Sequence, residues 1–141
     1  MVKAIQKNIL YIALIQALIA MFGSLYFTEI AHFPACILCW YQRICMYPLV
    51  VILTVGILEK NKNIYKYVLP LTFIGSAIAL FHNLLYYKIL PDAAVPCIAG
   101  ISCTTKYIEW FGFLTIPLLS LIAFTVINSC MLIYWKSNSK K

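Results

Sequence analysis

Charged side chains are scarce in this sequence of 141 residues, and acidic ones are the scarcest. Only 11% of the residues are charged, with four Asp and Glu against eleven Lys and Arg, while 64% are hydrophobic. A soluble domain is typically about 25% charged and about 45–50% apolar. A soluble chain of this length could not hide so much apolar surface, because small domains bury only part of theirs. The composition therefore excludes a soluble domain and predicts that most side chains contact lipid.

The basic residues are confined to the ends of the hydrophobic segments, although the net charge is +7. No basic stripe follows a predicted face, which is what nucleic acid binding requires. The sequence also has no nucleotide-binding motif, internal repeat or low-complexity tract. These absences argue against nucleic acid as a partner and leave membrane lipid as the expected surroundings.

Four hydrophobic stretches predict four transmembrane helices. About 20 helical residues cross a hydrocarbon core of about 30 Å. The second stretch is uncharged only over residues 44–58, so we extend it outward to Cys39, which draws Arg43 into the outer part of the membrane. The prediction is an all-α integral membrane four-helix bundle. It forms a single transmembrane domain over residues 1–141, with helices at roughly 8–28, 39–58, 67–87 and 111–135.

The distribution of Lys and Arg predicts that both termini are cytoplasmic. Positive residues collect in cytoplasmic loops. With the termini inside, eight of the eleven basic residues lie on the cytoplasmic side, and the other three are Arg43, Lys88 and Lys106. This topology predicts two extracytoplasmic loops, at roughly 29–38 and 88–109, and long loops often carry function. The first stretch is longer than the core of a cleaved signal peptide, so we expect it to be retained.

Small and amide residues inside the helices predict where helices approach one another. Small residues let helix backbones come close in a membrane, and amides form hydrogen bonds between helices. We expect amide contacts from Gln16 and Asn83. Gly23, Ser24, Gly75, Ser76 and Ala77 are small enough to permit close contact between helices.

Four of the six cysteines form two pairs on the predicted outer side. Cys36 and Cys39 make a C-x-x-C at the start of the second helix, and Cys97 and Cys103 make a C-x5-C in the second outer loop. Two static disulfides are one interpretation, since this compartment is oxidising. However, C-x-x-C closes too small a ring to be a good staple. A helix N-terminus with a nearby positive charge stabilises a thiolate, which favours a redox couple that exchanges with the loop pair.

Arg43 lies four residues after Cys39 and therefore on the same helical face. A charged residue within the membrane indicates a functional site, the alternative being a side chain that extends to the headgroups. Electrons that reach the helix pair need an acceptor, and without a nucleotide motif the sequence favours a lipid-soluble quinone. Cys45 and Cys130 are expected to be ordinary small apolar side chains.

The C-x-x-C stretch resembles the disulfide bond formation protein B (DsbB) family, and most closely its short BdbC type. The resemblance covers nearly the whole chain. It includes residues 23–27, residues 96–103, and Trp110-Phe111-Gly112-Phe113. The most specific part is Cys36-Ile37-Leu38-Cys39-Trp40-Tyr41-Gln42-Arg43.

This resemblance implies a quinone-dependent protein disulfide oxidoreductase in the bacterial cell membrane. Such a protein reoxidises an extracytoplasmic thioredoxin-like thiol-disulfide oxidoreductase of the DsbA or BdbD kind and passes the electrons to a quinone, either menaquinone or ubiquinone. It thereby supports disulfide bond formation in secreted proteins.

The resemblance also implies roles for individual residues. Cys39 is the thiolate that faces the quinone, Cys36 is its disulfide partner, and Arg43 binds the quinone. Cys97 forms the mixed disulfide with the partner, and Cys103 resolves it and attacks Cys36. The narrow spacing of the loop pair departs from the long forms of the family and leaves the division between Cys97 and Cys103 open.

Two further positions resemble the family less directly. His82 matches a histidine of the family near the outer end of the third helix, where it contacts the quinone or is simply a hydrogen-bonded bundle residue. Gln42 stands where the long forms often carry an acid, which changes the charge beside Arg43.

Two other classes of function remain open. Four cysteines could hold zinc or copper(I) in a cysteine-based metal-binding membrane protein, although no histidine lies at a standard ligand spacing. A structural membrane subunit with fixed disulfides is the other.

Overall fold

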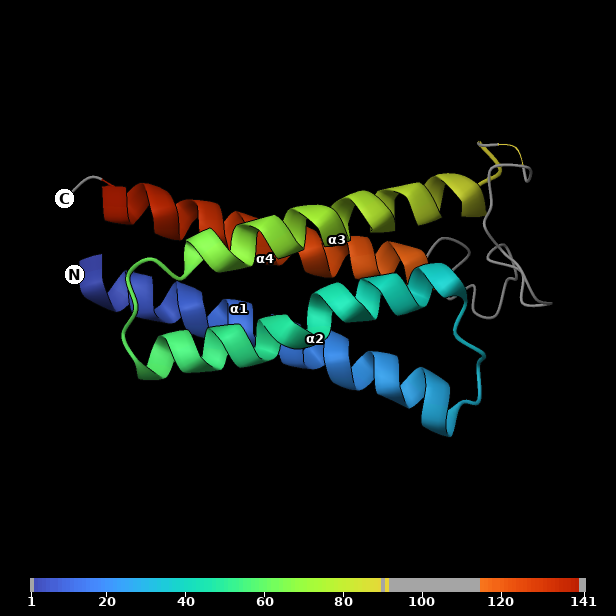
Figure 1. Ribbon diagram of the computed structural model, residues 1–141, viewed down its shortest axis with the longest axis horizontal. Coiled ribbons are helices and arrows are strands. Elements are labelled where there is room, and N and C mark those ends of the chain that lie inside the picture. The colour runs from blue at the N-terminus through green and yellow to red at the C-terminus, as the bar shows by residue number, and fades with distance from the viewer. Residues whose placement is uncertain (1, 90, 92–114, 140–141) are drawn as a thin grey trace.

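The computed structural model describes residues 2–89, 91 and 115–139. It contains four long helices, and a short π-helical segment extends the first of them (Figure 1). No strand occurs in the part of the chain that is described. The elements are α1 (Val2–Leu25), η1 (Tyr26–Ile30), α2 (Ile37–Leu58), α3 (Tyr65–Tyr86) and α4 (Ile116–Ser139). The predicted all-α four-helix bundle is confirmed.

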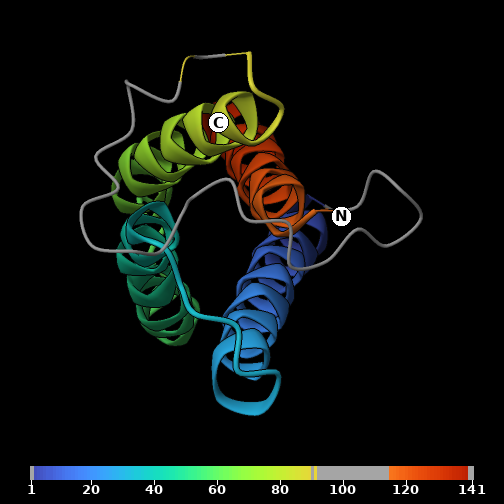
Figure 2. The same ribbon diagram turned by 90° about the vertical axis from the view of Figure 1, so that its right-hand side faces the viewer.

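The helices run alternately up and down around a common axis. Each packs against two neighbours, in the cyclic order α1, α2, α3, α4, as the end-on view shows (Figure 2). The start of α1 and the end of α4 lie at one end of the bundle, together with the short link from α2 to α3 (Figure 1). The start of α2 therefore lies at the opposite end from the termini, as the predicted topology requires. The cytoplasmic location of the termini stays a prediction.

All four helices are long and apolar enough to cross a membrane, α1 together with η1. Their outward faces carry large apolar side chains, among them Phe22, 61% exposed, and Leu58, 75% exposed. In water this surface would be unfavourable, so the exposed apolar band indicates contact with lipid. Helix α2 begins two residues earlier than Cys39, because Cys36 caps its N-terminus.

The core between the helices is apolar and contains a few hydrogen-bonded amides. Phe124, Ile127 and Met131 of α4 are fully buried in it. Cys45 is part of this core and Cys130 packs against it, as expected for ordinary apolar side chains. The Asn83 side chain donates to the carbonyl of Pro117 at 2.8 Å, which joins α3 to α4 and confirms the expected amide contact.

Gly75 of α3 packs tightly against α4, which its small size permits. A Cβ atom at Gly75 would overlap the ring of Phe124. At Gly23, by contrast, no helix uses the space that the small residue leaves, because a Cβ there would meet nothing within 4 Å. Gly23 faces a cavity instead of a neighbouring helix.

We expect Gly75→Ala to destabilise the bundle by about 1–3 kcal/mol, because overfilling a packed core shifts backbone or rotamers. The thermal unfolding midpoint of the protein in detergent measures this. Gly23→Ala is the matched control and should leave the midpoint unchanged or slightly raised. Adding Phe124→Leu to Gly75→Ala should recover part of the loss, and equal midpoints for the two alanine variants would contradict the packing argument.

Candidate functional site

The C-x-x-C motif lies across the start of α2. Cys36 has an extended backbone (φ −69°, ψ 168°) and is the N-cap, its sulfur accepting a hydrogen bond from the backbone N–H of Cys39 at 3.4 Å. The two sulfurs are 2.9 Å apart. The first N–H groups of a helix carry partial positive charge and stabilise an anion. The Cys36 sulfur therefore occupies a position that favours a thiolate.

His82 of α3 completes a chain of polar contacts with this sulfur. Its Nε2 lies 3.8 Å from the Cys36 sulfur, and its Nδ1 lies 3.2 Å from the side-chain nitrogen of Gln42. When the Gln42 amide donates to Nδ1, the proton of the neutral ring is on Nε2, facing the sulfur. The imidazole is only 2% exposed, so it is held in this orientation by the bundle.

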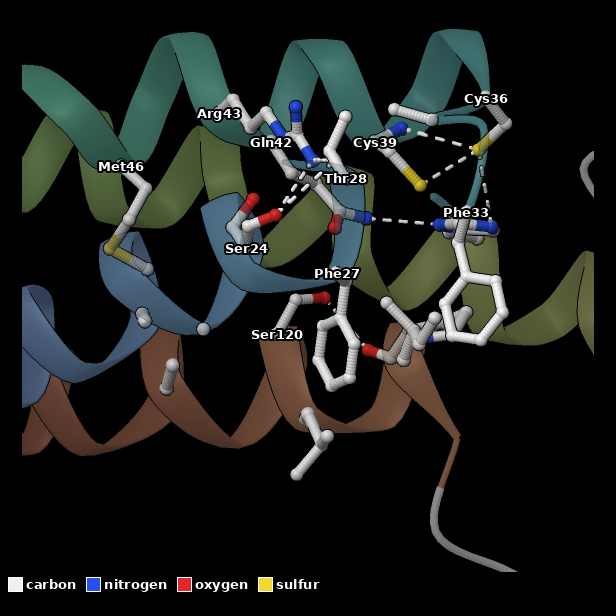
Figure 3. A pocket seen from close by; sticks show the side chains of 18 of the residues that line it. Ser24, Phe27, Thr28, Phe33, Cys36, Cys39, Gln42, Arg43, Met46 and Ser120 are labelled. Carbon is white, nitrogen blue, oxygen red and sulfur yellow. Dashed lines mark hydrogen bonds between the residues drawn. The ribbon is translucent and has the colours of Figure 1, made fainter. Parts of the chain in front are cut away.

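Arg43 is held against α1 and η1 by its guanidinium group. One terminal nitrogen donates to the carbonyl of Ser24 at 3.0 Å and to the hydroxyl of Thr28 (Figure 3). The guanidinium carbon also lies 5.3 Å from the centre of the Trp40 ring, in cation–π contact. These contacts hold the charge toward the interior of the bundle. A side chain that only extended to the lipid headgroups would not need them.

A cavity of about 280 Å³ joins these residues and is lined by side chains of all four helices. Cys36, Cys39, Arg43 and His82 all line it. Its size is near the lower end of the roughly 300–1,000 Å³ typical of small-molecule sites. The four described residues of the predicted site therefore meet in one place. Cys97 and Cys103 lie outside the described residues.

The walls of the cavity are mainly apolar, with a few polar atoms. Phe27, Met46 and Leu119 are among the apolar residues. The Nε of Arg43 and the hydroxyl of Tyr47 are buried without a hydrogen-bond partner. An apolar site with few convergent polar groups suits a flat, lipid-soluble molecule that carries hydrogen-bond acceptors.

Sequence reasoning missed Tyr47 and the two anchors of Arg43. The signal for Tyr47 was available, because Cys39, Arg43 and Tyr47 follow one another at intervals of four residues and so share a face of α2. Ser24 and Thr28 are likewise four apart, but only the fold shows that α1 and η1 face Arg43.

The hydrogen bonds around Cys36 change its acidity. The side-chain hydrogen bond from Cys39, supported by His82 and opposed in part by burial, lowers the pKa of Cys36 to about 4. An ordinary cysteine in an unfolded chain titrates near about 8.5. These contacts therefore favour a thiolate in the reduced site at neutral pH, the form that attacks disulfides and leaves readily from them.

We expect the Cys36 thiolate to persist in the reduced protein at pH values where ordinary thiols are protonated. Because its folded pKa is depressed, its stabilising effect is full above the unfolded pKa and disappears as the pH falls through the folded value, a window of about pH 4–9. Thiolate absorbance during a pH titration measures this, with Cys36→Ser lacking the low step and Cys45→Ser keeping it. A wild-type titration with no step below about pH 8 would contradict the assignment.

Comparison with known proteins adds an independent line of evidence. The family model described as "Disulfide bond formation protein DsbB" matches residues 6–136. The chain is 50% identical over 119 residues to "Disulfide bond formation protein C" of Bacillus subtilis, covering 84% of this chain and 86% of that protein. No solved structure is significantly similar.

Two further relatives are similar over nearly their full length. The chain is 45% identical over 128 residues to "Probable disulfide formation protein C" of Halalkalibacterium halodurans, covering 90% of this chain and 93% of the relative. It is 43% identical over 132 residues to "Probable disulfide formation protein C 1" of Bacillus anthracis, covering 94% and 95%.

Proposed function

Because the chain belongs to the DsbB family, and is therefore a multi-pass bacterial membrane protein that acts as a disulfide oxidoreductase in disulfide bond formation, we propose that it reoxidises an extracytoplasmic thioredoxin-like thiol oxidase and passes the electrons to a membrane quinone. The partner is of the DsbA or BdbD kind, and the quinone is menaquinone or ubiquinone. The observation that supports this most is the placement of Cys39 and Arg43 on one cavity within the membrane span.

The residues around the cavity fit a quinone. Its ring is flat and apolar, which suits walls that include Phe27 and Met46. Its carbonyl oxygens accept hydrogen bonds, which suits the unpartnered Nε of Arg43 and hydroxyl of Tyr47. When bound, the quinone supplies an acceptor for two electrons and two protons. His82, the second residue proposed to contact it, lines the same cavity.

The chain's own cysteines move the electron pair by two exchanges. A thiolate of the reduced partner attacks the Cys97–Cys103 disulfide at Cys97 and releases Cys103. The partner's second thiolate then displaces Cys97, so that the partner leaves oxidised and the loop pair is reduced. The resemblance gave this resolving step to Cys103, but attack by Cys103 would only restore the loop disulfide and release the partner still reduced. The Cys103 thiolate next attacks Cys36 in the Cys36–Cys39 disulfide. Cys97 then attacks Cys103 of the resulting Cys103–Cys36 disulfide, which releases Cys36 and restores the Cys97–Cys103 disulfide.

Cys39 is the leaving group of the second exchange. When its bond to Cys36 breaks, Cys39 departs as a thiolate on the wall of the cavity. The charge of Arg43 stabilises this anion in surroundings of low dielectric constant. The arginine thus favours both the departure of the thiolate and the orientation of a bound acceptor.

The decisive experiment is to incorporate the purified chain into lipid vesicles with a quinone and add a reduced thioredoxin-like partner. We expect the partner to be oxidised and an equal amount of quinol to form. Labelling of the termini and the cysteines from each side of the vesicles tests the topology. Partner oxidation without quinol, or cysteine pairs on the same side as the termini, would overturn the proposal.

A further inference from the structure

Ligand atoms of the kind that thiophilic metals bind converge at the edge of the cavity. The sulfurs of Cys36 and Cys39 and a ring nitrogen of His82 lie within 4.8 Å of one another. The sequence has no histidine at a spacing from these cysteines that is standard for a metal site. The fold supplies one, because α3 brings His82 to the start of α2 from 46 positions away.

We propose that the reduced Cys36–Cys39 pair and His82 bind one Zn²⁺ ion, and that the disulfide form of the pair does not. Both cysteines lose their thiol protons to solvent, and the ion takes two thiolates and one neutral imidazole. Three protein ligands with the fourth position open is a common arrangement for zinc. All three residues line the cavity, which has room for a fourth ligand.

The observed distances are close to those that zinc requires. Zn–S bonds of about 2.3 Å and Zn–N bonds of about 2.0–2.1 Å hold tetrahedral ligand atoms about 3.4–3.8 Å apart. Cys36 and His82 are already separated by 3.8 Å, and the two sulfurs by 2.9 Å. The sulfur–sulfur distance must open by less than about 1 Å, and the third separation, between the Cys39 sulfur and His82, is within 4.8 Å.

Charge balance also favours the ion at this buried position. Two thiolates neutralise the divalent cation, so the occupied site carries no net charge, and a neutral group is far less costly to bury than an isolated ion. The Cys36 sulfur is already poised as a thiolate by its helix-cap hydrogen bond. The positive charge of Arg43 on the same cavity repels a cation, but the negative charges of the two thiolates offset this repulsion.

Gln42 supplies the outer contact that metal-binding histidines usually have. Binding through Nε2 requires the ring proton on Nδ1, which lies 3.2 Å from the Gln42 amide. A rotation of that side-chain amide by about 180° places its oxygen, in place of its nitrogen, where it accepts a hydrogen bond from Nδ1–H. Such outer partners fix the ring and typically contribute about 10–100-fold in metal affinity.

Bound zinc would hold the site reduced and idle. Sulfurs that ligate the ion cannot form the Cys36–Cys39 disulfide, so the enzyme would stop turning over until a chelator removed the metal. This regulatory consequence rests on the proposed function, whereas metal binding by the reduced pair does not.

The test uses the full-length chain in detergent with Cys97→Ser and Cys103→Ser, which removes the loop thiols. Zn²⁺ is titrated in competition with a chromophoric chelator, without quinone or partner, and Cd²⁺ provides an independent signal through its thiolate charge-transfer band. We expect one ion per reduced chain and none at that affinity once Cys36 and Cys39 are oxidised. Cys45→Ser and Cys130→Ser are the matched controls and should bind as tightly as their parent.

His82→Ala and Gln42→Ala separate this site from binding by two thiols alone. We expect Gln42→Ala, which removes an outer partner, to weaken Zn²⁺ binding by about 10–100-fold, and His82→Ala, which removes a ligand, to weaken it more than Gln42→Ala does. The helical signal in circular dichroism identifies any variant that fails to fold. In that case Cys36→Ser, which also removes a ligand, takes its place in the Zn²⁺ titration. Equal affinity of the reduced and oxidised chains, or of His82→Ala and its parent, would overturn the proposal whatever the quinone assay shows.

Discussion

Replacing Cys39 with alanine is expected to abolish quinol formation while leaving the loop cysteines able to exchange with the partner. The variant keeps Cys36 but has no second sulfur on α2 with which to form a disulfide. The electron pair therefore has no route from the loop to the cavity. The measurement is quinol production in vesicles, together with trapping of the mixed disulfide between chain and partner on a non-reducing gel.

Cys45→Ala is the matched control for this variant, because Cys45 lies on the same helix but in the apolar core. It should retain most of the wild-type rate, with at most a small loss of stability. Normal reoxidation of the partner by Cys39→Ala would show that the electrons leave by another path. The proposed order of exchange would then be wrong.

Replacing Arg43 with methionine is expected to lower quinone-linked turnover by about 10²–10³-fold, the cost typical of removing a preorganised group from a developing negative charge. Methionine keeps the unbranched apolar stem of the side chain but is shorter and uncharged. It removes the bonds to Ser24 and Thr28 and the unpartnered Nε. Initial rates at varied quinone concentration separate a loss in kcat from a rise in KM.

Arg43→Lys tests whether charge alone is enough. Lysine keeps the positive charge but cannot present the planar fork of donors. We expect it to recover part of kcat with KM still raised, since the Ser24 and Thr28 contacts that aim the group are not reproduced. A methionine variant within twofold of wild type would contradict any role of Arg43 in the reaction.

Much of the candidate site followed from one rule of helix geometry. Residues four apart share a face, so Cys39 and Arg43 were expected together, and both line the cavity. The same rule would have included Tyr47. The rule acts within one helix, however, and it is silent about what a neighbouring helix presents to that face.

Contacts between helices are where the expectations were incomplete. His82 was considered for the quinone site, but its position against the Cys36 sulfur and Gln42 could not be predicted. That contact depends on the rotation and height of α3 relative to α2, which many side chains decide together. Gly23 shows the same limit, because a small residue permits close packing without requiring it.

By itself the sequence determined the membrane environment, the four helices and the C-x-x-C pair at the start of the second helix, because hydrophobic length, charge placement and local spacing act along the chain. Tertiary structure alone decided which atoms meet around that pair. It brought a histidine of α3 to the Cys36 sulfur, anchored Arg43 on α1 and η1, and left a cavity among four helices. Such contacts arise from the packing of distant segments, and no local pattern of residues encodes their distances.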